Sequence, residues 1–248
     1  MTVLTHEREQ PGLKLSGIMR HMITALIFDF DGLILDTETA EIRTWQRIYT
    51  EYGHPFPHDE FIKTVGGYGI SNFDAAIYLD RITSGSLNAD SLRLRFRNES
   101  GDEIRRSPIL PGVTKIISEA KRKHMKLAVA SSSSHEWVDT HLTRLGLYQQ
   151  FDRIICREDV PAGRTKPKPD LYLKALEQLA VRADEALVFE DSPNGVEAAN
   201  IAGIAVVVAP NPTTSRLPFK GNYLKVKSLA DLSLADMLQH FEAMKKRV

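Results

Sequence analysis

Short runs of consecutive apolar residues recur along the chain, and most are followed by a segment whose apolar positions repeat with helical spacing. The apolar runs lie near 24–30, 126–131, 153–156, 186–190 and 204–208. Runs of this length are typical of strands buried on both faces of a parallel sheet. The helical segments lie near 112–123, 135–145, 170–181, 193–202 and 232–246. This alternation predicts an α/β fold with a doubly wound, Rossmann-like parallel sheet covered by helices on both faces.

One stretch near the N-terminal end breaks this alternation, because it shows helical periodicity and no strand pattern. Helices are expected there at about 37–52, 58–64, 71–82 and 88–106. Trp45 and Phe61 are expected in the core of this helical unit, and the Gly66–Ile70 segment is expected to form a turn. The predicted organisation is an N-terminal extension, 1–22, an α/β catalytic core, 23–36 and 108–248, and an inserted helical cap domain, 37–107.

Composition and charge narrow the range of partners. Lys+Arg and Asp+Glu both number 32, so the net charge is zero and no nucleic acid or anionic membrane is expected as a partner. No apolar run approaches the roughly 18 residues of a transmembrane helix, and the first residues lack the apolar core of a signal peptide. The single cysteine, Cys156, fits a reducing compartment and a buried structural role. We expect a cytoplasmic monomer, whose translation could also start at Met19 or Met22.

The most informative pattern is the end of the first apolar run, which leads directly into Asp29, Asp31 and Gly32. Side chains two positions apart in an extended segment point to the same side, so the two carboxylates can face one site. Open α/β sheets bind ligands at this carboxyl end of their strands. Because neighbouring carboxylates repel each other, such a site favours a cation or a raised pKa. An alternative interpretation is a polar strand end closed by an Asp-Gly turn.

Three later segments favour the catalytic interpretation. Ser131 and Ser132 follow the second apolar run. Lys166 lies in a Lys-Pro-Lys-Pro-Asp segment before a helix, and Glu190 and Asp191 end a further apolar run. In order and residue type, the four segments resemble the four motifs of the haloacid dehalogenase superfamily. The resemblance covers about residues 23–210 and is nearest to members with a small helical cap, such as β-phosphoglucomutase and phosphoglycolate phosphatase.

The resemblance implies a role for each catalytic candidate. Asp29 would be the nucleophile that forms an aspartyl-phosphate, and Asp31 the general acid and base. The presence of Asp31 favours phosphate esters over the other substrates of the family. Ser131 and Lys166 would bind the phosphate, assisted by the backbone N–H of Ser132. In isolation, serines after a strand are ordinary helix caps and a loop lysine is ordinarily solvated.

The resemblance also implies a Mg²⁺ cofactor. The implied ligands are the carboxylates of Asp29 and Asp191, the backbone carbonyl of Asp31, and Glu190, which could act through water. A Ser-Pro pair follows Glu190 and Asp191. The two acids can therefore also be interpreted as a strand end that precedes a helix cap. Both interpretations can hold together, because helix starts and phosphate sites coincide.

Two further residues are candidates for the substrate site. Gly32 allows the turn after the acids and lies next to the expected phosphate position. Besides the Gly66–Ile70 turn, Glu41 is the cap residue that we expect to face the substrate. It occupies the place where β-phosphoglucomutase carries a catalytic histidine, and the arginine that follows the cap turn in that enzyme is missing from Gly69-Ile70-Ser71. Both departures favour a phosphatase over a mutase.

The predicted function is a Mg²⁺-dependent phosphatase, a phosphoric monoester hydrolase that acts on a small phosphorylated, sugar-phosphate-like metabolite through an aspartyl-phosphate. A phosphomutase of the β-phosphoglucomutase type is the first alternative. A non-catalytic phosphate-binding protein on the same fold is the second. The complete set of motif residues weighs against this second alternative, because a decayed site is expected to lose at least one of them.

Overall fold

A computed structural model describes residues 22–64 and 71–245. The predictions for the extension that precedes Met22 and for the Gly66–Ile70 turn lie outside the described residues. Within the two described ranges, six strands form one sheet in the order β3-β2-β1-β4-β5-β6, in which all neighbours are parallel. The strands are β1 (Ala25–Phe28), β2 (Lys126–Ala130), β3 (Arg153–Ile155), β4 (Ala186–Glu190), β5 (Ala205–Val208) and β6 (Leu224–Lys225). The predicted parallel sheet is therefore confirmed.

The chain order reverses at β1, because the chain first builds the sheet outward through β2 and β3 and then returns to add β4 on the other side. Open α/β sheets hold ligands at such a switch point, beyond the carboxyl ends of the strands. Phe28 of β1 is in register with Val129 of β2 and with Phe189 of β4. The segments that follow these three strands therefore leave the sheet at the same level and can share one site.

Successive residues of β1 alternate between two apolar cores, as the pleat of a strand requires. Leu26 and Phe28 pack on one face with residues of α5, α6 and α9, whereas Ala25 and Ile27 pack on the other with α7 and α8. These helices are α5 (Val113–Arg122), α6 (His135–Arg144), α7 (Asp170–Leu179), α8 (Pro193–Ile201) and α9 (Leu234–Lys245). Helices thus cover both faces, and the central strand is shielded from water on both sides.

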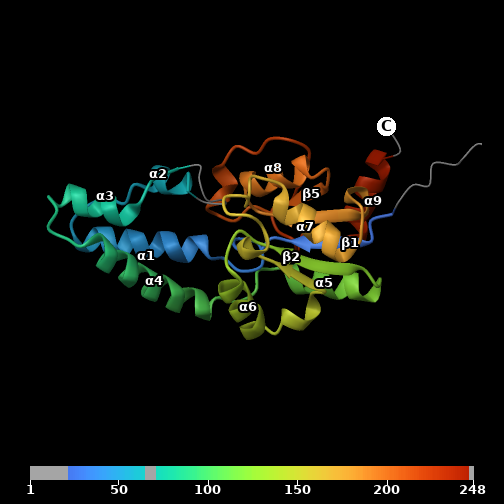
Figure 1. Ribbon diagram of the computed structural model, residues 1–248, viewed down its shortest axis with the longest axis horizontal. Coiled ribbons are helices and arrows are strands. Elements are labelled where there is room, and N and C mark those ends of the chain that lie inside the picture. Colours follow the sequence, from blue (N-terminus) through green and yellow to red (C-terminus); the bar gives the residue numbers. More distant parts are fainter. Residues whose placement is uncertain (1–21, 65–70, 246–248) are drawn as a thin grey trace, which may run out of the picture.

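Four further helices form a separate unit, which we call the helical insert and which extends to one side of the sheet in Figure 1. They are α1 (Glu38–Glu51), α2 (His58–Ile62), α3 (Ala75–Ile82) and α4 (Ala89–Arg106). Trp45 stacks on Phe96 with ring centroids 4.5 Å apart, and the Tyr49 hydroxyl donates to the Ala75 carbonyl at 2.6 Å. Phe61 packs against this apolar core and is partly buried. The insert therefore has a core of its own.

The two connections between the insert and the sheet run side by side. Leu35 and Ile109 form an antiparallel bridge, and the Leu110 N–H donates to the Ile34 carbonyl at 2.9 Å. The first connection begins a few residues after β1, so the insert is attached beside the carboxyl edge of the sheet. This attachment brings α1 close to the segments that follow β1, β2 and β4.

The element ends differ from the predictions in a few places. The α3 helix begins only at Ala75, because the Asp74 side chain accepts from the Ile77 N–H at 2.9 Å and caps it. The strand β6 is not among the predicted strands, since two residues are too few to show a periodic pattern. Cys156 is fully buried, as predicted. Among the described residues, no helix is both long and apolar enough to cross a membrane.

Candidate active site

The predicted site residues meet at the carboxyl edge of the sheet. Asp29 and Asp31 follow β1, Ser131 follows β2, and Glu190 and Asp191 lie at the end of β4. Each strand carries buried apolar residues up to this edge, so the polar residues begin where the sheet ends. Strand order and register, rather than sequence distance, bring the three motifs together.

Lys166 lies between two of these carboxylates. Its Nζ is 2.6 Å from Asp29 Oδ1 and 2.6 Å from Glu190 Oε1, and its side chain is 2% exposed. Burial alone lowers the pKa of Lys166, but Asp29 and Glu190 outweigh it and raise the pKa above its ordinary value. The lysine therefore stays charged in the interior. Lys168 instead donates to the Gly163 carbonyl at 2.8 Å in an exposed position.

Glu190 is fully buried and accepts hydrogen bonds on both carboxylate oxygens. Its Oε1 accepts from Lys166 at 2.6 Å and from the Tyr172 hydroxyl at 2.5 Å. Its Oε2 accepts from the Asp191 N–H at 3.1 Å and from the Ser192 N–H and hydroxyl at 3.2 Å and 3.1 Å. These contacts use the lone pairs of a carboxylate, which number about four. Glu190 therefore holds Lys166, and a bridging water suits its role toward a metal better than direct contact.

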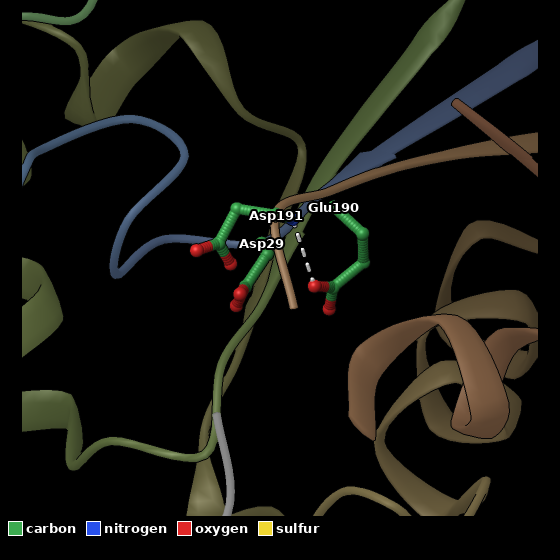
Figure 2. A group of neighbouring side chains, drawn as sticks. All are labelled: Asp29, Glu190 and Asp191. Atoms are coloured by element: carbon green, nitrogen blue, oxygen red, sulfur yellow. Dashed lines mark hydrogen bonds between the residues drawn. The ribbon is translucent and has the colours of Figure 1, made fainter. Parts of the chain in front are cut away.

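Asp29, Glu190 and Asp191 form the acidic cluster expected of a metal site, because one carboxylate oxygen of each lies within 4.8 Å of the others. In Figure 2, the carboxylates of Asp29 and Asp191 lie next to each other, whereas Glu190 curls back toward the N–H of Asp191. The Oδ1 of Asp191 is buried and has no hydrogen-bond partner among the described residues. The cluster holds three carboxylates and one lysine, Lys166, which contacts two of them, so it can accept two more positive charges. These hard oxygen donors fit Mg²⁺.

The pKa values show that the cluster lacks positive charge. Burial raises the pKa of Asp29 to about 7, Glu190 adds to this shift, and Lys166 opposes it. Burial also raises the pKa of Asp191 well above its usual range, and Glu38 and Glu190 add to that shift. A divalent cation would displace the protons from both carboxyls. The electrostatics of the cluster therefore agree with the donor set.

Asp31 is held by side chains from the segment after β2. The Ser133 hydroxyl donates to Oδ2 at 2.6 Å, and Trp137 Nε1 donates to Oδ1 at 2.9 Å. The Ser131 hydroxyl donates to the same Oδ2 at 3.3 Å. The Oγ of Ser132 is buried without a partner among the described residues. Both oxygens of Asp31 are thus oriented by the core, and the contacts of Ser133 and Trp137 are not among the sequence predictions.

Polar residues that are not among the sequence predictions also surround Asp191. Asn211 Nδ2 donates to Asp191 Oδ2 at 2.8 Å and to Glu38 Oε2 at 3.3 Å, and the Thr214 hydroxyl donates to Asp191 Oδ2 at 3.3 Å. Burial and the charge of Asp31 raise the pKa of Glu38 well above its usual range. Asn211 follows β5 closely, so the rule that polar residues gather at the carboxyl edge could have found it.

Gly32 lies where a larger residue would disturb the acidic cluster. Its φ is +76°, in the left-handed region, and a Cβ there would lie 2.3 Å from Asp191 Oδ2 and 2.6 Å from Asn211 Nδ2. Glycine is therefore needed both for the turn and for this close approach. Its contact with a substrate phosphate stays a prediction.

A cavity of about 800 Å³ opens between these residues and the helical insert. This volume lies within the range of small-molecule sites. The core contributes Asp29, Asp31, Ser131, Ser132, Ser133, Ser134, Trp137, Arg157 and Lys166. The insert and its first connection contribute Thr37, Glu38, Glu41, Phe61, Thr64, Ser71, Asn72, Phe73 and Asp74. Glu41 thus lies at the cavity, and its contact with a substrate stays a prediction; Phe61 both lines the cavity and packs in the insert.

Residues 26–209 match the family of haloacid dehalogenase-like hydrolases, a span that includes all of the site residues from Asp29 to Asp191. The chain belongs to this family. It is 39% identical to "Putative phosphatase YhcW" of Bacillus subtilis, over 90% of this chain and 99% of that protein. It is 35% identical to "Phosphorylated carbohydrates phosphatase" of Thermotoga maritima, over 73% of this chain and 82% of that protein. These matches confirm the predicted family and the prediction of an enzyme of the phosphatase class.

Solved structures of haloacid dehalogenase-like proteins show the same fold. CbbY from Rhodobacter sphaeroides, solved as a mutant in complex with xylulose-(1,5)bisphosphate, superposes with a TM-score of 0.67 at 27% identity, covering 86% of this chain and 98% of that one. This likeness extends over the sheet and the helical insert, because it spans most of both chains. It confirms the α/β architecture with its inserted helices.

Proposed function

We propose that this enzyme is a Mg²⁺-dependent phosphatase that hydrolyses a small phosphorylated metabolite through an aspartyl-phosphate on Asp29. The observation that carries the proposal is the buried contact of Lys166 with Asp29 and Glu190, at 2.6 Å each, beside the unpartnered Oδ1 of Asp191. Phosphoryl transfer depends mainly on positioning and on charge stabilisation, which such a site supplies. The relative named for phosphorylated carbohydrates supports a sugar-phosphate-like substrate.

The chemistry needs two steps, in which Asp29 and Asp31 return to their starting states. A carboxylate oxygen of Asp29 bonds to phosphorus and the ester P–O bond breaks, while Asp31 gives its proton to the leaving oxygen. A water then attacks the phosphorus, Asp31 takes a proton from this water, and the bond between phosphorus and Asp29 breaks. The products are an alcohol and inorganic phosphate. The donors around Asp31, Ser133 and Trp137, keep its carboxyl in place for both proton transfers.

The remaining residues bind the phosphate and the metal. Lys166, the Ser131 hydroxyl and the Ser132 N–H would bind the phosphoryl oxygens. Asp29, Asp191 and the carbonyl of Asp31 would hold Mg²⁺, with Glu190 acting through water. The ion would screen the repulsion between the nucleophile and the phosphate oxygens. The insert, 37–107, would act as a cap that excludes water during transfer.

Phosphate release from a panel of phosphorylated metabolites, with and without Mg²⁺, tests the proposal. Asp29→Asn should abolish release, whereas Asp59→Asn should not, because the Asp59 side chain is fully exposed in α2. Asp31→Asn should still form phosphoenzyme from a substrate with a reactive leaving group, such as p-nitrophenyl phosphate, but should hydrolyse it slowly. Substantial turnover by Asp29→Asn would refute the nucleophile assignment. Isomerisation that depends on a sugar bisphosphate, with no net release, would favour the mutase instead.

A further inference from the structure

The part of the cavity beyond the reacting phosphate is poor in positive charge. Among the described residues, no lysine or arginine of the helical insert lines the cavity. Residues 65–70, which are not described, contain no basic residue in the sequence. The core contributes Lys166, which already contacts two carboxylates, and Arg157, whose Nε lies 3.2 Å from Glu158 Oε1. A second anionic group on the substrate would therefore find few partners.

Two acidic side chains of the cavity differ in whether they are neutralised. Asp74 is paired with Arg93, with 2.8 Å between its Oδ2 and Arg93 Nη2. Glu41 lines the cavity from α1, is partly buried, and its carboxylate has no hydrogen bond or ion pair within the described chain. Burial raises the pKa of Glu41 to about 7, and the charge of Asp31 adds to this shift. The surroundings of Glu41 thus disfavour negative charge and would disfavour an anionic substrate group in the same way.

We propose that this enzyme selects phosphate monoesters whose remaining part is uncharged and carries hydroxyl groups, and that Glu41 is the residue that makes this selection. The proposal rests on the proposed phosphatase function and specifies its substrate. A carboxylate accepts hydrogen bonds from hydroxyl groups and offers none to a second phosphate or carboxylate. Selectivity then arises because the Glu41 carboxylate attracts hydroxyl groups of the substrate and repels a second anionic group.

The other walls of the cavity suit the same class of substrate. Phe61 and Phe73 of the insert present aromatic rings that can cover the C–H groups of a polyol or sugar. Asn72 adds an exposed amide, which can both donate to and accept from hydroxyl groups. The cavity therefore combines apolar surface with neutral and acidic hydrogen-bonding groups, as a carbohydrate-like leaving group requires.

Matched pairs of substrates test the proposal. Glycerol 3-phosphate and 3-phosphoglycerate have the same carbon skeleton, and a terminal CH₂OH in the first replaces a carboxylate in the second. Glucitol 6-phosphate and 6-phosphogluconate form a larger pair of the same kind. At pH 8, where Glu41 is mostly ionised, kcat/KM should be at least roughly 10-fold higher for the neutral member of a pair that is hydrolysed. The ratio should fall towards 1 in Glu41→Gln, while Glu51→Gln, on the same helix but paired with Arg95, should keep it.

Each outcome bears on a separate conclusion. Equal kcat/KM values for both members of each pair in the wild type would overturn the proposal, while hydrolysis itself would leave the phosphatase function intact. An unchanged ratio in a folded Glu41→Gln protein would overturn the role of Glu41. Hydrolysis of no substrate, including p-nitrophenyl phosphate, would overturn the phosphatase function and this proposal with it. If Glu41→Gln fails to fold, Glu41→Ala is measured in its place, and an unchanged ratio in that variant would equally overturn the role of Glu41.

Discussion

Gly195→Ala is a small substitution that should damage both the stability and the activity of this enzyme. Gly195 lies in the first turn of α8, directly over the Glu190 carboxylate. A Cβ there would lie 1.8 Å from Glu190 Oε1 and 1.9 Å from its Cδ, whereas Cβ atoms rarely approach another heavy atom within about 3.0 Å. The carboxylate must therefore move by about 1 Å or more. It would then lose its bonds to Lys166 and to the Tyr172 hydroxyl.

The expected magnitude follows from two opposing effects. Alanine is favoured over glycine within a helix by roughly 0.5–1 kcal/mol. Breaking a buried ion pair costs about 3–5 kcal/mol. The lower end applies here, because Lys166 keeps a second carboxylate partner, Asp29, that still opposes its charge. The net loss is about 2 kcal/mol, which corresponds to a fall in Tm of roughly 4–8 °C for a chain of this size. Displacement of Lys166 by about 1 Å should lower kcat on the order of 100-fold.

Gly101→Ala is the matched control, because Gly101 also lies inside a helix, α4, at a negative φ. A Cβ at this position meets only the end of the flexible Arg105 side chain, at 3.3 Å. The control should therefore leave Tm unchanged or raise it slightly. The assay is thermal unfolding followed by circular dichroism, together with steady-state hydrolysis of p-nitrophenyl phosphate. If Gly195→Ala matches the control in both Tm and kcat, the buried contact between Glu190 and Lys166 is not what stabilises this site.

The other predictions concern the metal, the thiol and Asp31. The pKa of Asp29 is raised from its ordinary value of 3.8 to about 7, and the pKa of Asp191 is also raised. Because the folded, metal-free protein then binds protons that the unfolded chain releases, it should lose stability as the pH rises from 3.8 to about 7. Mg²⁺ should accordingly increase Tm more at pH 8 than at pH 5.5 in calorimetry, and an equal increase at both would contradict the metal assignment. Cys156 is fully buried, with a thiol pKa raised by burial, and should react with Ellman's reagent only in denaturant; rapid reaction of the folded protein would argue against this. Trp137→Phe removes the Nε1 donor to Asp31 and should slow phosphoenzyme hydrolysis, measured by rapid quench; an unaltered rate would show that Asp31 needs no such donor.

Five of the six strands in the described residues, most helices and the principal candidate site residues could be predicted from the sequence because they depend on short-range patterns. Four apolar residues in a row at Ala25–Phe28 indicate a buried strand by themselves, and the pleat of an extended segment places Asp29 and Asp31 on the same side. The order of the four motifs also indicated the family, and the family resemblance in turn implied roles for Ser131 and Lys166. These inferences need no knowledge of which strands are neighbours.

The tertiary structure alone decided how the site residues are held. Trp137 and Asp31 are separated by 106 positions, and Asn211 and Glu38 by 173, yet each pair is joined by a hydrogen bond. Such contacts depend on the strand order and on the exit directions of several loops at once, which no local pattern encodes. Gly195 lies only five positions after Glu190, but their closeness depends on how α8 packs against the end of β4, which the residue types alone do not specify. Local sequence thus determined which groups the site contains, and long-range packing determined which of them are charged, paired or free.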